Sequence, residues 1–202
     1  MRSSLHTTPR PDEEPVTVVW GELPPGQERE ATHAALLRAA AELTGAPAHR
    51  IRLDHAPDGG PRLTGPASGL RVSVSHTRGA GAVALSRHRP VGVDIETIRP
   101  IAAGPLARRW FDAACADWVA RSPRNDGVRA FLWLWTQKEA IGKARGHGLA
   151  AGGLTQPLAL PADTLTGPTG RLRPLPDDPR TACAVLPTGS PRHVLALAVA
   201  DG

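Results

Sequence analysis

Two acidic residues, Asp94 and Glu96, lie two positions apart in the run 92–96 (GVDIE). Apolar and polar residues alternate in this run, so a strand would carry both carboxylates on one face, with their Cα atoms roughly 6.5–7 Å apart. With Gly92 leaving room beside them, both carboxylates could reach one hard cation such as Mg²⁺. A strand with a merely solvated acidic face would show the same alternation, and this motif alone leaves both interpretations open.

A second charged group lies in the run 135–143 (WTQKEAIGK), inside the longest expected helix. Glu139 and Lys143 are four residues apart and are therefore neighbours on one helical face, while Lys138 lies beside Glu139. The alternative to a site is an ordinary ion pair on the helix surface. Lys138 and Lys143 are the only lysines in a chain with 24 basic residues, which hints at a place where a compact ammonium group is needed. Trp135 is expected to pack in the core.

Ser75 and His76 are adjacent in an expected strand. Adjacent strand residues point to opposite faces, which excludes a hydrogen-bonded Ser–His pair for nucleophilic catalysis. His76 is therefore expected to contact a phosphate or another ligand, or else to be a structural histidine.

Taken together, three carboxylates, two lysines and a histidine suit an octahedral Mg²⁺ that holds a pyrophosphate. The sequence has no GxxxxGK[ST] loop, no GxGxxG turn after a strand and no HExxH motif. Ordinary P-loop, dinucleotide-binding and zinc-protease sites are thereby excluded.

Hydrophobic periodicity predicts the elements that must position these residues. The expected helices span residues 27–43, 105–111, 113–121 and 127–146. The expected strands span residues 16–20, 70–75, 81–86, 90–95, 181–186 and 194–200. A turn is expected at 58–61, and 150–180 is expected to be mostly loop. The first half thus reads as a helix with an antiparallel meander, and the second half repeats that order loosely.

Composition narrows the class of protein. With 202 residues, 41% apolar and 21% charged, the chain is typical of a soluble globular protein. No run of 18 apolar residues and no secretory signal occurs, so the sequence predicts a cytoplasmic protein without a membrane span. Cys115 and Cys183 lie far apart, which excludes a disulfide scaffold and a cysteine-rich zinc site and favours two buried apolar residues. The net charge of +5 favours an acidic partner or a phosphorylated ligand.

Three segments, in this order and spacing, resemble the Sfp-type 4′-phosphopantetheinyl transferases of the holo-acyl-carrier-protein synthase superfamily. They are 73–77 (SVSHT), 91–96 (VGVDIE) and 134–149 (LWTQKEAIGKARGHGL). The resemblance covers residues 28–150 and continues more weakly to the C-terminus. It implies an α+β fold of two similar lobes, each a helix packed on a small antiparallel sheet, with a pseudo-two-fold axis and the active site in the cleft between them. The expected division is a flexible tail at 1–15, an N-terminal lobe at 16–98 and a C-terminal lobe at 99–202.

The resemblance also implies a reaction. Such enzymes move 4′-phosphopantetheine from coenzyme A to a serine of an apo acyl or peptidyl carrier protein, releasing adenosine 3′,5′-bisphosphate. The carrier would serve fatty-acid, polyketide or nonribosomal peptide synthesis, and a basic surface suits an acidic carrier. Since both motifs lie in one chain, a monomer is expected. The alternatives are another Mg²⁺-dependent phosphoryl or nucleotidyl transferase, an inactive scaffold, and a nucleic-acid-binding module. The last is disfavoured because the arginines are scattered, with no basic run.

By the same resemblance, Asp94, Glu96 and Glu139 match the ligands of Mg²⁺, which Mn²⁺ could replace. Glu139 also matches the proposed base for the carrier serine, and Lys143 the lysine that stabilises the leaving phosphate. Contacts to coenzyme A are implied for Ser75, His76, Lys138, Lys143, Arg29 and Arg62. The chain departs from the family at a Gly-Lys-Pro turn, which here reads Gly59-Gly60-Pro61-Arg62. Arg62 is the candidate to replace the missing lysine.

Overall fold

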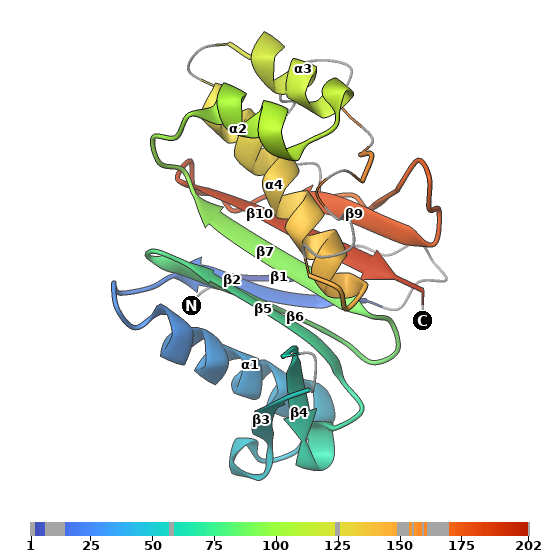
Figure 1. The fold of residues 1–202 in the computed structure, drawn as a ribbon. Helices are drawn as coiled ribbons and strands as arrows, with labels where there is room; N and C mark the ends of the chain where they lie inside the picture. Colours follow the sequence, from blue (N-terminus) through green and yellow to red (C-terminus); the bar gives the residue numbers. More distant parts are fainter. Residues whose placement is uncertain are drawn as a thin grey trace.

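The strands form two separate four-stranded antiparallel sheets and a small hairpin (Figure 1). The computed structural model describes residues 3–6, 15–56, 59–123, 126–148, 154, 156–158, 160 and 170–201. The helices are α1 (Glu28–Thr44), α2 (Ala103–Trp110), α3 (Ala113–Arg121) and α4 (Gly127–Ala144). The strands are β1 (Ser3–His6), β2 (Thr17–Glu22), β3 (Arg52–His55), β4 (Pro61–Thr64), β5 (Arg71–Thr77), β6 (Ala80–Ser86), β7 (Val91–Thr97), β8 (Arg173–Pro174), β9 (Thr181–Leu186) and β10 (His193–Ala200).

The first sheet has the strand order β1-β2-β6-β5. α1 packs on its outer face through small and apolar residues such as Leu36 and Ala40, and ends at Gly45, whose φ of 67° is the left-handed conformation that glycine adopts easily. A loose tail was expected at 1–15, and β1 corrects this for residues 3–6, which pair with β2; residues 1–2 and 7–14 lie outside the described residues. Backbone hydrogen bonds to an open sheet edge form the pair, and they require no apolar pattern in the sequence.

The second sheet has the order β7-β10-β9-β8. β7 was expected to extend the meander of the first half, and this was wrong: it pairs with β10, with Asp94 opposite Ala196. The short turn after β6 favoured a hairpin, but periodicity along a strand does not specify its partner. By hydrogen bonding, β7 therefore belongs with the second half of the chain.

The elements stack in four main layers, from α1 through the two sheets to α4 (Figure 1). The two sheets share a core of alanine, valine and leucine side chains from β2, β6, β7, β9 and β10, joined by Trp20. α2 and α3 cover α4 on the far side, where Phe111 stacks on Phe131 and Phe131 on Trp135. Trp135 is thus part of the core, as expected.

The other expected helices and strands are confirmed, with ends shifted by a few residues. The β3–β4 hairpin was missed because its residues are mostly exposed and only Leu63 is buried, so no alternation marks it. Much of the expected loop at 150–180, and part of the turn at 58–61, lie outside the described residues. Cys115 and Cys183 are buried, and burial raises the pKa of each thiol to about 12. No described helix combines the length and apolar character needed to cross a bilayer.

Candidate active site

β7 presents Asp94 and Glu96 on the side away from the core between the sheets, as their alternation with apolar residues predicted. α4 approaches this strand closely at Gly92. A Cβ atom there would lie 1.8 Å from the carbonyl oxygen of Ala140, so any other residue would push the helix away. The glycine was expected to leave room beside the carboxylates. It instead allows α4 to pack directly on β7, which brings Glu139 and Lys143 to them.

Lys143 joins the helix to the strand. Its Nζ donates to Oδ1 of Asp94 at 2.8 Å and to the carbonyl oxygen of Val93 at 3.1 Å. The Lys143 side chain is 28% exposed and that of Asp94 is 8% exposed. This ion pair crosses between two elements, whereas the sequence had suggested a pair with Glu139 within α4 as the alternative to a site.

The three carboxylates act on one another. Burial raises the pKa of Glu96 above its ordinary value, and the negative charge of Asp94 raises it further. Burial also raises the pKa of Glu139, and the charges of Asp94 and Glu96 add to this while Lys143 opposes it. Like charges are thus concentrated at one place on the molecule, and a bound cation would relieve their repulsion.

The donor set fits a hard divalent cation, because Mg²⁺ prefers carboxylate oxygens. Oδ2 of Asp94 is buried and has no hydrogen-bond partner among the described residues, so this oxygen is left for a ligand. In the described part of the chain, no three His, Cys, Asp or Glu side chains stand in an arrangement that could hold a metal ion. The chemistry of the three carboxylates fits the ion, and their side chains would have to draw together to bind it.

Ser75 and His76 point to opposite faces of β5, as strand geometry required. Ser75 is buried and its Oγ donates to Oδ1 of Asp94 at 2.7 Å. His76 is exposed and lies close enough to Glu28 and His33 of α1 to influence the pKa of each. The structure therefore brings Ser75 to the carboxylates and places His76 beside α1.

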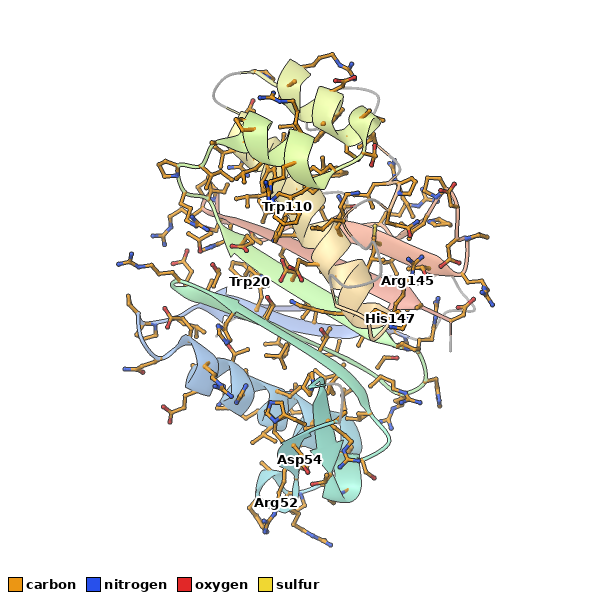
Figure 2. The ribbon with its side chains drawn as sticks, viewed as in Figure 1. Trp20, Arg52, Asp54, Trp110, Arg145 and His147 are labelled. Carbon is orange, nitrogen blue, oxygen red and sulfur yellow. The ribbon has the colours of Figure 1, made fainter. Side chains whose placement is uncertain are left out.

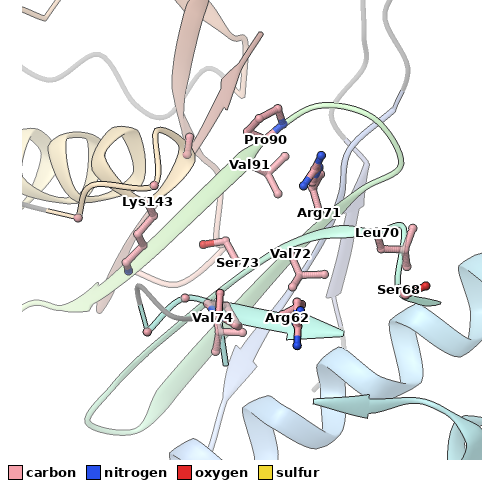
Figure 3. A pocket seen from close by; sticks show the side chains of 17 residues that line it. Arg62, Ser68, Leu70, Arg71, Val72, Ser73, Val74, Pro90, Val91 and Lys143 are labelled. Carbon is pink, nitrogen blue, oxygen red and sulfur yellow. The ribbon is translucent and has the colours of Figure 1, made fainter. Parts of the chain in front are cut away.

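A pocket of about 540 Å³ lies between β4, β5, the start of β7 and the end of α4, and none of the three carboxylates is among the residues that line it (Figure 3). Arg62 of β4, Arg71 of β5 and Lys143 of α4 line it, together with Ser73 and the backbone of several glycines. Arg62 is exposed and lies 3.7 Å from Asp54. Lys143 connects the two places, since it is among the residues that line the pocket and its Nζ bonds Asp94.

Lys138 is not brought to this pocket. Its side chain is fully buried, and its Nζ donates to the carbonyl oxygen of Gln156 at 2.5 Å and lies 3.7 Å from Oδ2 of Asp112. The ammonium also lies 5.2 Å from the ring centroid of Phe111. Burial lowers the pKa of Lys138. A phosphate contact by Lys138 stays a prediction. The complete burial of its ammonium group does not favour such a contact.

Two further residues complete the surroundings. Arg145, labelled in Figure 2, follows α4 and donates to Asp178 at 2.6 Å and to Oε1 of Gln156 at 2.7 Å. Gln156 is therefore held by both Lys138 and Arg145. Arg29 is exposed on the first turn of α1 and is not among the residues that line the pocket of Figure 3.

Comparison with known proteins decides the family. Residues 90–198, more than half of the chain, match the family model described as the 4′-phosphopantetheinyl transferase superfamily. The chain belongs to this superfamily.

Individual members of the superfamily match a shorter stretch. The 4′-phosphopantetheinyl transferase HetI of Nostoc sp. is 33% identical over 84 residues, which are 41% of this chain and 35% of HetI. The 4′-phosphopantetheinyl transferase gsp of Aneurinibacillus migulanus is 35% identical over 80 residues, 40% of this chain and 33% of gsp. The 4′-phosphopantetheinyl transferase psf-1 of Bacillus pumilus is 34% identical over 83 residues, 41% of this chain and 35% of psf-1. The matched stretches thus span about a third of each relative.

For this member of the phosphopantetheinyl transferase superfamily, sequence reasoning missed three residues at the site. Arg71 and Ser73 line the pocket, and Oγ1 of Thr77 donates to Oε2 of Glu96 at 3.2 Å. Ser73, Ser75 and Thr77 occur at every second position, so strand periodicity would have placed all three hydroxyl groups on one face. No sequence signal distinguishes Arg71 among the many arginines of this chain.

Proposed function

We propose that this protein transfers the 4′-phosphopantetheine group from coenzyme A to a serine of an apo carrier protein. One observation carries the proposal: Lys143 lines the pocket and also bonds Asp94, so the pocket and the carboxylates form one continuous site. Membership of the 4′-phosphopantetheinyl transferase superfamily supports the same reaction.

The pocket suits the anionic half of coenzyme A. Arg62, Arg71 and Lys143 place positive charge around a volume of about 540 Å³. Guanidinium groups bind phosphate through paired hydrogen bonds, and an ammonium group binds it as a point charge. The net charge of +5 favours a carrier protein of negative charge. Both halves of the site come from one chain, so we propose that a single protomer suffices.

Asp94, Glu96 and Glu139 are the residues that would hold a divalent cation. When bound, Mg²⁺ would neutralise charge on the pyrophosphate of coenzyme A and on the phosphorus under attack. Of these residues, Asp94 is the most buried, with a fractional exposure of 6%. Glu96 and Glu139 are half-buried and remain within reach of a ligand.

Glu139 is suited to accept the proton of the carrier serine. The family resemblance implies this role, and in the cation-free protein Glu139 lies close enough to Asp94 and Glu96 for their charges, together with burial, to raise its pKa. The serine Oγ would then attack the phosphorus that carries pantetheine, and the bond to the bridging oxygen would break. The leaving adenosine 3′,5′-bisphosphate takes the electron pair, and Lys143 is placed to neutralise the new charge or to donate a proton to it.

The test is the intact mass of apo carrier proteins after incubation with the full chain, coenzyme A and Mg²⁺. Fatty-acid, polyketide and peptide carriers are incubated in parallel, each with an EDTA control. The expected result is a mass gain of one phosphopantetheine group on at least one carrier, abolished by EDTA. Absence of any gain, together with no binding of coenzyme A, would refute the proposal. A gain matching a phosphoryl or nucleotidyl group instead would assign a different transferase.

A further inference from the structure

Three hydroxyl side chains of β5, Ser73, Ser75 and Thr77, form a row along the seam between the two sheets. They lie opposite small residues, the alanines Ala84, Ala82 and Ala80 of β6, and Ser73 and Ser75 are buried. β5 is the edge strand of the first sheet and β7 is the edge strand of the second. This hydroxyl row therefore faces a strand that no backbone ladder joins to β5.

The hydroxyl row provides hydrogen-bond acceptors for backbone N–H groups at the open edge of β7. The backbone N–H of Val93 donates to Oγ of Ser73 at 3.0 Å, and that of Ile95 donates to Oγ of Ser75 at 3.3 Å. Buried N–H groups need such partners, so these two bonds close the seam. If this were the whole role of the row, Ser73 and Ser75 would be equivalent.

Two members of the row do more than this. Ser75 donates its O–H to Oδ1 of Asp94 at 2.7 Å, and Thr77 donates to Oε2 of Glu96 at 3.2 Å. A hydroxyl group has a single O–H to donate. While these bonds exist, neither hydroxyl can also donate to a phosphate of a nucleotide.

The bonds to Asp94 leave one of its oxygens for a ligand. Ser75 and Lys143 both donate to Oδ1, whereas Oδ2 is buried and without a partner among the described residues. Two donors on the same oxygen limit the rotation of the Asp94 carboxylate, so its Oδ2 would keep one orientation while the other carboxylates draw together around a cation. A carboxylate that is held in this way loses less conformational entropy when it binds a cation.

We propose that Ser75 and Thr77 are positioning residues, which orient Asp94 and Glu96 for a divalent cation, whereas Ser73 lines the pocket and bonds the backbone of β7 but neither carboxylate. This inference rests on the proposed function, which makes these carboxylates cation ligands. It gives Ser75 a different task from the nucleotide contact that the family resemblance implied. Ser75 would act on the cation through Asp94 and on coenzyme A only through the cation.

The test is direct binding of Mn²⁺ to the full chain, measured by electron paramagnetic resonance of the free ion with and without coenzyme A. Outer-shell partners of metal ligands typically contribute about 10–100-fold in affinity. Ser75→Ala is therefore expected to weaken Mn²⁺ binding by about tenfold or more, and Thr77→Val by a smaller factor. The matched control is Ser73→Ala, which removes a hydroxyl of the same row that bonds no carboxylate and is expected to leave the Mn²⁺ affinity measured without coenzyme A near that of the wild type. Thr77→Ser keeps the hydroxyl group and is expected to restore binding.

Thermal unfolding of each variant shows whether it is folded. If Ser75→Ala does not fold, the isosteric Thr77→Val and its rescue by Thr77→Ser decide whether the row positions the carboxylates. Equal Mn²⁺ affinity in the wild type, Ser75→Ala and Thr77→Val would overturn the inference. So would a Ser75→Ala variant that binds Mn²⁺ normally but binds coenzyme A weakly at saturating Mn²⁺, because Ser75 would then contact the nucleotide. A wild-type chain that binds no Mn²⁺ would instead refute the proposed function, and the inference with it.

Discussion

Lys138 and Lys143 lie on different faces of α4, and each ammonium bonds one aspartate and one backbone carbonyl. Lys143 lies 2.8 Å from Asp94 and also donates to a carbonyl of β7. Lys138 lies 3.7 Å from Asp112 and donates to the carbonyl of Gln156. The two lysines thus have closely similar partners.

The two lysines differ in what covers the face of α4 on which each of them lies. The face of Lys138 is closed by α2, α3 and the segment around Gln156, and its side chain is 0% exposed. Oδ1 of Asp112 caps α3 there by accepting from the N–H of Cys115 at 2.9 Å, and its Oδ2 is buried, with no hydrogen-bond partner among the described residues and with Nζ of Lys138 at 3.7 Å. Lys143 is 28% exposed and borders the pocket. The same charged pair therefore stabilises the fold on one face and is available to a ligand on the other.

Removing Lys143 should have the largest effect on activity. Lys143→Ala is expected to lower the rate of phosphopantetheine transfer about 10²–10³-fold, the usual effect of deleting a group that stabilises charge in the transition state. The rate is followed by the mass gain of the carrier. The matched control, Lys138→Met, changes the other lysine of the same helix and is expected to stay close to the wild-type rate. Equal losses in the two variants would show that the two faces do not differ as described.

Removing Lys138 should instead affect stability. Lys138→Ala is expected to lower the free energy of unfolding by about 2–4 kcal/mol, because it leaves a cavity and deprives Asp112 of its counter-charge. Lys138→Met fills most of the space and should cost less. Denaturation in urea measures both values. A Lys138→Ala variant with unchanged stability and lost transfer would identify Lys138 as a substrate contact.

Removing the charge of a carboxylate near Lys143 should raise the stability of the protein and abolish its activity. The raised pKa of Glu139 means that its charged form is disfavoured in the fold, so Glu139→Gln should stabilise the protein without divalent cations while abolishing transfer. Its Tm should rise by about 1–3 °C, since partly exposed charges contribute below about 1 kcal/mol and each kcal/mol shifts Tm by about 2–4 °C. The control is Glu42→Gln, at an exposed position of α1, which should leave Tm unchanged. A lower Tm for Glu139→Gln would contradict the repulsion among the carboxylates.

A further expected effect is a pH dependence of stability that originates from Lys138. The folded chain holds the proton of Lys138 less tightly than the unfolded chain, because burial lowers the pKa of Lys138. As pH rises through this lowered pKa toward the ordinary value of about 10.5, the folded state gains stability, at most about 1.4 kcal/mol per pH unit. The unfolding free energy of the wild type should therefore increase relative to Lys138→Met over this range. If the unfolding free energies of the wild type and Lys138→Met changed with pH in the same way, this would show that burial does not lower the pKa of Lys138.

Much of this contrast was predictable from local sequence. The alternation in 92–96 placed Asp94 and Glu96 on one face of a strand, and the spacing of Glu139 and Lys143 placed them on one face of a helix. The same geometry separates the lysines: at about 100° per residue, five positions turn the helix by about 140° beyond a full turn, so Lys138 and Lys143 cannot share a face. The period of two along β5 likewise contains Thr77.

Long-range pairing was not predictable in this way. The partner of β7 depends on which sheet edge is open after α4 and β10 have packed, and β10 lies about 100 residues further along the chain. Ser3–His6 pairs through backbone groups, which every sequence supplies. The closure over Lys138 depends on Gln156, in a Gly- and Pro-rich region without periodicity. Strand alternation and helix spacing thus predicted each side chain's face, but not what packs against that face.

We propose that Lys143 joins the pocket and the carboxylates into one site. The decisive measurement is calorimetry of coenzyme A binding to the full chain, in Mg²⁺ and in EDTA. We expect clear binding in Mg²⁺ that EDTA weakens strongly and that Lys143→Ala weakens in Mg²⁺. Binding of equal strength in Mg²⁺ and EDTA, or no binding in either, would contradict it.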